Sequence, residues 1–250
     1  MPEPINQAQA MRYNRHIVLP QIDLEGQERL LNARVLIIGA GGLGCSAAQL
    51  LCASGVGTLT LVDDDHVEVT NLPRQVLFTD ADVGQYKVAA AQQKLNQLNA
   101  SCQIKTYSRR LDLTELASQA GAHNIVLDCT DNLSARLATN AACAVSRTPL
   151  VSGAAIRFEG QLFTTSYAPD TSCYECVSAL TGNPDLSCTE SGIFSPVVAI
   201  IGAQQALIAM QLIAGIGKPL LNTLQLFDAL SGQWQQFIVP ENPQCTVCQG

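Results

Sequence analysis

The sequence predicts an α/β fold in which a doubly wound, mostly parallel sheet is continued by antiparallel strands. Between residues 34 and 153, short apolar runs alternate with helical stretches, which is typical of βαβ units. A glycine-rich turn, Gly39-Ala-Gly-Gly-Leu-Gly44, joins the first apolar run to the first of these helical stretches. Beyond Gly153 strand-like segments outnumber helical ones. These observations together predict a Rossmann-like sheet with an antiparallel extension.

Each element of the first half rests on an apolar run or a helical period. A partly amphipathic helix is expected before the sheet, over residues 11–32. Turn signals at residues 99–101 and at Thr148-Pro149 separate later elements. In chain order we then expect strand 34–38, helix 44–53, strand 58–63, helix 81–98, strand 103–107, helix 113–120, strand 124–129, helix 132–146 and strand 149–153.

The second half is predicted to continue the sheet, with loops that carry cysteines. The expected elements are strands 160–167, 223–228 and 234–239 and a helix over 197–214. The sequence has no repeat or low-complexity linker, so we expect a single domain over residues 1–250. Its three parts are a helical region (1–32), a nucleotide-binding half (33–153) and a second half (154–250).

Charge and hydropathy exclude some classes of function. The net charge of -7 argues against general nucleic-acid binding, which needs a basic face. The first nine residues are polar and contain no secretory signal, so we expect a cytoplasmic protein with mostly reduced cysteines. Residues 192–217 carry no charge and could span a bilayer by length. Because this stretch contains Pro196 and three glutamines, a buried helix is favoured over a membrane span.

The glycine turn is typical of a nucleotide site. Gly39, Gly41 and Gly44 have the spacing that permits a sharp turn and lets a phosphate approach the N–H groups that open a helix. Asp63 ends the next strand, where an acidic residue suits a ribose hydroxyl.

Further charged residues follow other strands of the predicted sheet. Arg74 and Lys87 could hold phosphates, and Asp131 could hold a magnesium ion. In doubly wound sheets ligands bind outside the carboxyl ends of the strands, where these residues are expected. The set favours a nucleotide triphosphate. An NAD-linked oxidoreductase is the alternative, because the glycine turn and Asp63 alone fit a dinucleotide equally well.

Two CxxC pairs, Cys173/Cys176 and Cys245/Cys248, predict a structural zinc site with four sulfur ligands. The alternative is redox chemistry, but neither pair is predicted at a strand-to-helix turn. Cys188 precedes the uncharged helix and is either a reactive thiolate or an idle cysteine. The other five cysteines are interpreted as small core residues: Cys45, Cys52, Cys102, Cys129 and Cys143.

Several motifs together resemble the bacterial E1-like adenylyltransferases of the ThiF/MoeB/HesA family. They are Arg12-Tyr-Asn-Arg15, the glycine turn, Asn71-Leu-Pro-Arg-Gln75, Asp128-Cys-Thr-Asp-Asn132 and the two CxxC pairs. The resemblance covers nearly the whole chain and identifies it as one E1-like adenylation domain, whose second half binds a carrier protein and zinc.

The resemblance implies ATP-dependent adenylylation of the C-terminal glycine of a ubiquitin-like sulfur carrier ending in Gly-Gly, with release of pyrophosphate. It implies ATP and Mg²⁺ at the nucleotide site, structural Zn²⁺ on the four cysteines, and a homodimer in which Arg15 reaches the triphosphate of the other subunit. The implied catalytic residues are Arg15, Arg74, Lys87 and Asp131. The implied nucleotide contacts are Gly39, Gly41, Gly42, Gly44, Asp63, Asp65, Thr70, Asn71, Arg74, Lys87, Asp131 and Asn132.

The branch of the family is decided only by short segments. Residues 151–160 resemble the molybdopterin branch, whereas Leu226-Phe-Asp228 and Gln233-Trp234 resemble the thiamine branch, so the molybdopterin carrier is favoured and the thiamine carrier is the alternative. Cys188 matches a sulfur-linked cysteine of the thiamine branch, but a cysteine there does not separate the branches. No rhodanese-like extension follows, and a separate sulfur donor is expected. Pro73 and Tyr86 depart from the family pattern and motivate a third alternative, a carrier-binding module without turnover.

Overall fold

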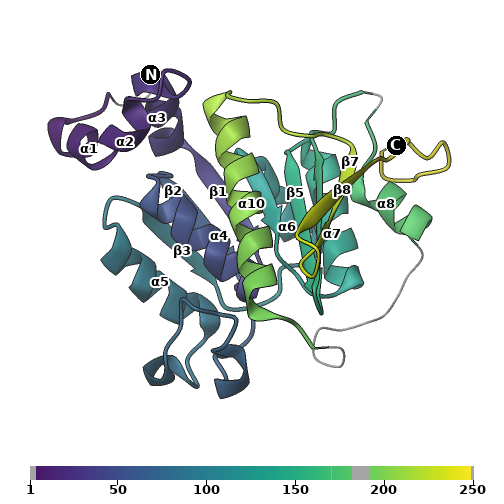
Figure 1. Cartoon of the computed structure of the whole chain (residues 1–250), viewed down its shortest axis with the longest axis horizontal. Coiled ribbons are helices and arrows are strands. Elements are labelled where there is room, and N and C mark those ends of the chain that lie inside the picture. Colours follow the sequence, from purple (N-terminus) through teal and green to yellow (C-terminus); the bar gives the residue numbers. More distant parts are fainter. Residues whose placement is uncertain (1–3, 170, 182–191, 249–250) are drawn as a thin grey trace.

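A computed structural model describes residues 4–169, 171–181 and 192–248. These residues form one eight-stranded sheet with the strand order β3-β2-β1-β4-β5-β6-β7-β8 (Figure 1). Strands β1 to β5 run parallel, and β5 to β8 pair antiparallel. The strands are β1 (Arg34–Ile38), β2 (Thr58–Val62), β3 (Gln103–Tyr107), β4 (Ile125–Asp128), β5 (Leu150–Ile156), β6 (Glu159–Thr165), β7 (Thr223–Asp228) and β8 (Gln233–Ile238). The predicted fold class is confirmed.

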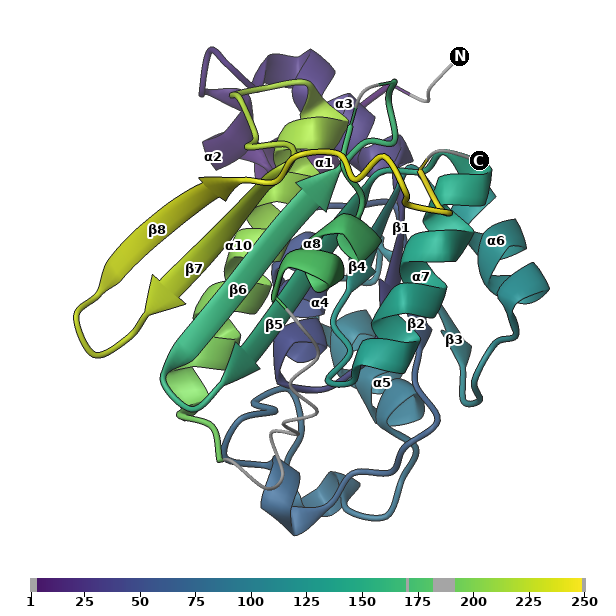
Figure 2. The same ribbon diagram turned by 90° about the vertical axis from the view of Figure 1, so that its right-hand side faces the viewer.

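Helices cover both faces of the parallel strands (Figures 1 and 2). On one face lie α4 (Gly42–Ala53), α5 (Lys87–Leu98) and α10 (Ser195–Ala214), and on the other lie α6 (Leu113–Gly121), α7 (Leu133–Ser146) and α8 (Tyr174–Thr181). Strand β1 is central because its side chains enter both layers. Val35 and Ile37 pack into the first apolar cluster, while Leu36 and Ile38 pack into the second.

The N-terminal region differs from the single predicted helix 11–32. It contains α1 (Gln7–Arg12), α2 (Asn14–Ile17) and α3 (Asp23–Asn32). The helices are separated because Asp23 has a left-handed φ of 52° and Tyr13 closes α1. All three pack at the amino end of the parallel strands, where the Tyr13 hydroxyl accepts a hydrogen bond of 2.9 Å from Asn99.

The predicted helix 81–98 begins later than expected, at Lys87. Residues Asp80–Asp82 instead form a short 3-10 turn (η2), which is held by Asp82 accepting from the backbone N–H of Thr79 at 2.7 Å. Gly84 has a φ of 87°, which a right-handed helix does not allow. A second 3-10 turn, η1 (Val69–Asn71), lies earlier in the same connection.

Helix α10 is a core helix. It is long and apolar enough to cross a membrane, but half of its most apolar stretch is buried within the protein. A Cβ on Gly202 would stand 2.4 Å from the carbonyl of Leu43, so α10 lies directly against α4. The buried Gln205 side chain donates to the carbonyls of Asp128 (2.7 Å) and Val151 (3.0 Å). These contacts agree with the predicted buried helix.

Two further differences concern the second half. Strand β6 ends at Thr165 rather than at residue 167, and Tyr167 takes a left-handed φ of 52°. Helix α8 was predicted as part of a cysteine-bearing loop. Helix α8 is short, and its apolar residues pack against β6 and α7. Its stability comes from this tertiary packing, so the local sequence pattern does not predict it.

Candidate functional site

The glycine turn closes tightly between β1 and α4. A Cβ on Gly39, whose φ is 93°, would stand 2.7 Å from the carbonyl of Cys129, and a Cβ on Gly44 would stand 2.0 Å from the carbonyl of Gly39. Gly41 is different, since its nearest neighbour would be the Gln75 amide at 3.8 Å. The turn therefore packs against protein at Gly39 and Gly44 and faces open space at Gly41, where a phosphate could approach the first turn of α4.

Gly42 is constrained by packing as well. A Cβ there would stand 2.8 Å from the Val198 side chain and 3.1 Å from the carbonyl of Arg74. Helix α10 and the Arg74 segment therefore approach the turn so closely that only glycine fits at residue 42.

Asp63 is fixed directly against the glycine turn. Its carboxylate accepts from the backbone N–H of Ala40 at 2.7 Å and from that of Asp65 at 2.8 Å. Burial raises the pKa of Asp63 above its ordinary value, although Lys87 and the two N–H donors act in the opposite direction. Each oxygen keeps a second lone pair, so the carboxylate can still accept a ribose hydroxyl.

Lys87 is held at the start of α5 by Asp65. Its ammonium lies 2.8 Å from the Asp65 carboxylate, and its backbone N–H donates to the Asp65 carbonyl at 2.9 Å. The Lys87 side chain is only 8% exposed, whereas that of Asp65 is 65% exposed. Next to this pair the His66 and Tyr86 rings stack at 4.1 Å. The Lys87 ammonium is therefore largely buried and held in a fixed position, with the exposed Asp65 carboxylate beside it.

The connection that carries Thr70, Asn71 and Arg74 is ordered by its own hydrogen bonds. The Arg74 guanidinium donates to the carbonyl of Thr70 at 2.9 Å, and the carbonyl of Asn71 accepts from the N–H groups of Arg74 and Gln75. Gln75 is only 2% exposed, and its Oε1 has no hydrogen-bond partner among the described residues. This buried side chain beside Gly41, whose amide oxygen lacks a partner among the described residues, is a site feature that the sequence did not predict.

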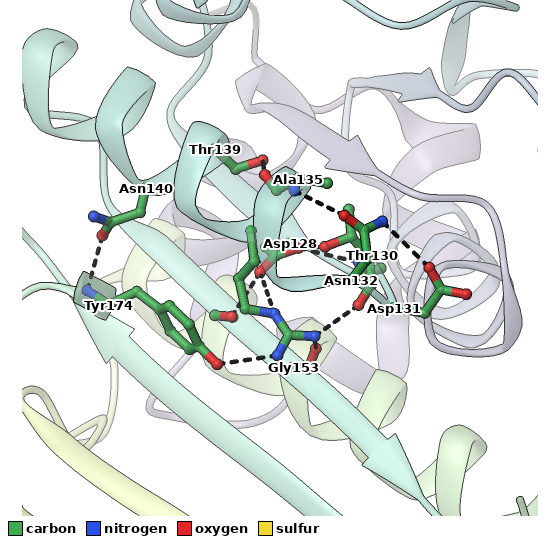
Figure 3. A network of polar contacts seen from close by, with 12 residues as sticks. Asp128, Thr130, Asp131, Asn132, Ala135, Thr139, Asn140, Gly153 and Tyr174 are labelled. Atoms are coloured by element: carbon green, nitrogen blue, oxygen red, sulfur yellow. Dashed lines mark hydrogen bonds and ion pairs between the residues drawn. The ribbon is translucent and has the colours of Figure 1, made fainter. Parts of the chain in front are cut away.

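Asp131 and Asn132 begin the connection from β4 to α7. Asn132 caps α7, because its side chain accepts from the N–H of Ala135 at 2.9 Å. Asp131 is exposed beside it (Figure 3). Asn132 therefore has a structural role in helix capping. Asp131 has an exposed carboxylate, which could hold a cation.

A buried ion pair supports this connection and was not predicted as part of the site. Asp128 is fully buried and accepts from Thr130 Oγ1 at 2.6 Å and from Ser152 Oγ at 2.7 Å (Figure 3). Arg136 Nε lies 3.2 Å from Asp128 Oδ2. Burial acts to lower the pKa of Arg136, but the charge of Asp128 and the nearby Tyr174 outweigh it and raise that pKa. The available sequence signal was one charged residue, Arg136, inside the otherwise uncharged helix α7.

The glycine turn contacts each of the other segments. It meets the Asp63 carboxylate through the N–H of Ala40, the Arg74 segment through Gly42, and the segment after β4 through Gly39. Arg15 is not part of this arrangement within one chain. It is exposed on α2, at the amino end of the strands, opposite the connection 63–86 (Figures 1 and 2).

The four predicted cysteines come together. Cys173 Sγ lies 3.6 Å from Cys245 Sγ, Cys176 Sγ lies 3.6 Å from Cys248 Sγ, and all four sulfurs lie within 4.8 Å of one another. Tetrahedral zinc with Zn–S bonds of about 2.3 Å needs sulfurs roughly 3.8 Å apart, so this donor set fits zinc. Strand β6 ends at Thr165, so Cys173 does not lie at a strand-to-helix turn, although it directly precedes α8. The convergence of two pairs nevertheless favours a metal over redox chemistry.

The remaining cysteines divide into two groups. Cys45, Cys52, Cys102, Cys129 and Cys143 are buried, as expected of core residues. Burial raises the pKa of Cys45 to about 12, and the nearby Asp63 adds to this effect, so its thiol is a poor nucleophile at neutral pH. The predicted Cys188 lies outside the described residues.

Comparison with known proteins gives a consistent result. The sequence model of the ThiF family matches residues 13–247. The molybdopterin-synthase adenylyltransferase of Escherichia coli is 44% identical over 244 residues, 98% of each chain, and its sulfur carrier protein ThiS adenylyltransferase is 42% identical over 246 residues, again 98% of each. A crystal structure of Escherichia coli MccB with ATP has a TM-score of 0.77 at 25% identity, covering 90% of this chain and 69% of that one.

Proposed function

The chain belongs to the ThiF family and is an adenylyltransferase, and we propose that it activates the C-terminal glycine of a ubiquitin-like sulfur carrier of molybdopterin synthesis. The observation that carries this proposal is the contact of the glycine turn with the segments of Asp63, Arg74 and Asp131. Because one turn contacts all three segments, groups suited to a ribose, a phosphate and a cation lie at a single edge of the sheet, which supports the proposal.

The reaction is a displacement at phosphorus. A carboxylate oxygen of the carrier attacks the α-phosphorus of ATP, a C(O)O–P bond forms, the bond between the α- and β-phosphates breaks, and pyrophosphate leaves. The attacking carboxylate is already ionised at neutral pH, so no general base is required. Rate enhancement then comes from alignment and from neutralisation of charge on the phosphates.

The chain's own residues supply these effects. Asp63 binds the ribose, the N–H groups at Gly41 and Gly42 face a phosphate, and Lys87 and Arg74 neutralise its charge. Magnesium would add further positive charge to the triphosphate, and the exposed Asp131 carboxylate fits it. The buried Oε1 of Gln75, which lacks a hydrogen-bond donor among the described residues, would accept from a hydroxyl or amino group of the nucleotide.

Zinc at the four cysteines has a structural role in this proposal. Four sulfur ligands leave no open position for a substrate. The cluster ties residues 173–176 to residues 245–248 and thereby fixes the C-terminal segment against β6 and α7.

We further assign a homodimer and a cytoplasmic location. Arg15 lies on α2, at the amino ends of the parallel strands, whereas the nucleotide edge of the same chain lies at their carboxyl ends. This separation supports a contribution of Arg15 to the site of the partner subunit. A mixture of Arg15→Ala and Asp131→Ala chains should regain part of the activity that each alone lacks, because mixed dimers contain one intact site. Equal inactivity of the mixture and of the separate variants would contradict shared sites.

ATP–pyrophosphate exchange tests the reaction and its carrier. We expect exchange that depends on a carrier ending in Gly-Gly and is faster with a molybdopterin carrier than with a thiamine carrier. The reverse order would assign the chain to thiazole synthesis. Absence of exchange with either carrier, despite ATP binding, would support a binding module without turnover.

Two substitutions test the assigned roles. Arg74→Ala and Asp131→Ala should each lower exchange by about 10²- to 10³-fold, as expected on loss of one preorganised electrostatic contact. Arg109→Ala is the control, since Arg109 pairs with Glu115 on the surface of α6 and should leave the rate unchanged. Normal rates in both test variants would refute the assignment.

The NAD-linked alternative is separated by calorimetry. The comparisons do not favour it, and we expect ATP to bind more tightly than NAD. Tighter binding of NAD would reverse the choice of nucleotide.

A further inference from the structure

We propose that Tyr174, which lies between two of the four clustered cysteines, is a positioning residue for the connection that carries Asp131. Through it, occupancy of the cysteine site and binding of nucleotide are coupled. The proposal rests on the proposed function, because it concerns the same nucleotide edge. It is carried by a chain of hydrogen bonds that runs across α7 from Cys173 to Thr130. Figure 3 shows the part of this chain from Asn140 to Thr130.

At the cysteine end the chain begins with Asn140. This fully buried residue of α7 donates through Nδ2 to Cys173 Sγ at 3.5 Å. Its Oδ1 accepts from the backbone N–H of Tyr174 at 2.8 Å. One side-chain amide, that of Asn140, therefore holds both the Tyr174 backbone and the sulfur of Cys173.

The Tyr174 side chain makes the central link. Its hydroxyl accepts from Arg136 Nη1 at 3.0 Å and from Gln161 Nε2 at 3.3 Å. The guanidinium of Arg136 also lies over the Tyr174 ring, 5.3 Å from the centroid, and Phe163 packs edge-on to that ring at 6.3 Å. The ring is thus fixed on two sides, and its hydroxyl sets the direction of one arm of the guanidinium.

The other groups of Arg136 reach the nucleotide edge. Nη2 donates to the carbonyl of Thr130 at 2.8 Å, and Nε faces the Asp128 carboxylate at 3.2 Å. Asp128 in turn accepts from the N–H of Thr130 at 3.0 Å. Both polar groups of the Thr130 backbone are therefore held by the ion pair, and the next residue in the chain is Asp131.

The rigidity of the guanidinium makes the coupling effective. Its donors lie in one plane at fixed angles, so rotation of one arm moves the others. The pair is buried, where polar contacts are strong and unpaired groups are costly. A shift of α8 caused by loss of metal would move the Tyr174 hydroxyl and reorient the donors that hold Thr130. Couplings between two sites typically change affinity by about 5- to 150-fold.

Tyr174→Phe tests the link while keeping the ring and its stacking on Arg136. We expect the zinc content to stay at one ion per chain and the dissociation constant for Mg-ATP to rise by about 5- to 30-fold in calorimetry. The matched control is Tyr167→Phe. The Tyr167 hydroxyl donates to the backbone carbonyl and Oδ1 of the same Asn140, at 3.1 and 2.9 Å, but it makes no contact with Arg136.

The control should lower the melting temperature to a similar degree and leave ATP affinity within about twofold. Unchanged ATP affinity in Tyr174→Phe with zinc retained would overturn the proposal. Equal weakening in both variants would also overturn it, because a general loosening around α7 would then explain the effect.

The reciprocal measurement uses the metal as the probe. Since coupling of two binding equilibria is mutual, saturating Mg-ATP should lower the fraction of Zn²⁺ that is transferred at equilibrium from wild-type protein to a competing colorimetric chelator. In Tyr174→Phe the nucleotide should have no effect on this transfer. An undiminished effect in the variant would contradict the link.

Failure of the proposed function gives a different pattern. If the wild-type chain binds Mg-ATP but activates no carrier, the function is wrong while the coupling is still measured. If the carrier is activated and Tyr174→Phe behaves as wild type, the function stands and the coupling is wrong. A wild-type chain that binds no ATP would overturn both.

Discussion

The nucleotide edge and the four-cysteine cluster are built from the chain in different ways. The polar contacts that hold the charged groups of the edge join residues of neighbouring elements, Lys87 with Asp65 and Ala40 with Asp63, which are 22 and 23 positions apart. The sulfur contacts of the cluster join residues 72 positions apart. Asp65 and Asp131 at the edge are exposed, whereas three of the four cysteines are buried. The carboxylates of the edge are therefore accessible to a ligand, whereas the cluster joins distant segments of the chain in the protein interior.

The largest effect should come from breaking the backbone of the edge. In Gly44→Ala the new Cβ would stand 2.0 Å from the carbonyl of Gly39, so the turn must open or the protein must unfold. We expect a loss of more than about 4 kcal/mol of stability or no folded protein in thermal denaturation. Gly121→Ala is the control, since its Cβ would meet only the Ser146 side chain at 3.5 Å, and it should be neutral or slightly stabilising. Equal stability of the two variants would contradict this packing.

The next effect removes a charge from the edge and leaves the fold intact. Lys87→Ala should lower pyrophosphate release by about 10²- to 10³-fold, because Lys87 is held by Asp65 where phosphate charge must be neutralised. Lys94→Ala is closely matched, since Lys94 is on the same helix and is paired with Asp82 at 3.1 Å. It should retain the wild-type rate. Comparable losses in both would show that α5, and not the Lys87 charge, is what matters.

The cluster is tested by Cys176→Ser. Loss of one thiolate should abolish stoichiometric zinc, measured by elemental analysis, and lower the melting temperature by about 5–10 °C, since bound metal stabilises the folded state. Cys143→Ser removes a buried thiol outside the cluster and should keep the metal. Full zinc content in Cys176→Ser would refute the four-sulfur site.

The smallest effect concerns Asp82, in the connection that precedes Lys87. Its carboxylate accepts from the N–H of Thr79 and pairs with Lys94. Burial disfavours the ionised form of Asp82 and acts to raise its pKa. Hydrogen bonds from Thr79 and Lys94 to the carboxylate outweigh burial, so the pKa of Asp82 is lowered. Because its pKa is lowered in the folded state, the ionised Asp82 carboxylate stabilises the fold at pH values above its ordinary pKa of 3.8. This contribution is lost as the pH falls below 3.8 and the carboxylate becomes protonated. Asp82→Ala should therefore cost about 1 kcal/mol at pH 7, and the difference from wild type should shrink below pH 3.8.

Asp80→Ala, two residues earlier in the same turn, is the control for Asp82→Ala and should be near neutral at either pH. A difference between wild type and Asp82→Ala that stays constant across this pH range would rule out the charged form of Asp82 as the source of stability.

Spacing along the chain was enough to predict much of the edge. Gly39, Gly41 and Gly44, the acidic residue that ends β2 and the basic residue that opens α5 are each tied to a strand or helix terminus, and parallel strands bring those termini to one edge. Local order of this kind is encoded in hydrophobic period and turn chemistry. The start of α5 at Lys87 was missed because Gly84 and the Asp82 cap act against an otherwise helical pattern.

The sequence by itself determined the fold class, the glycine turn with Asp63 and Lys87, and which four cysteines form the cluster. Only the tertiary structure decided that the two CxxC pairs meet, that α8 begins at Tyr174, and that Arg136 connects Tyr174 to Thr130. The physical reason is sequence distance. Short-range spacing is fixed by backbone geometry, whereas contacts 34 to 72 positions apart depend on how α7, β6 and the C-terminal segment pack together.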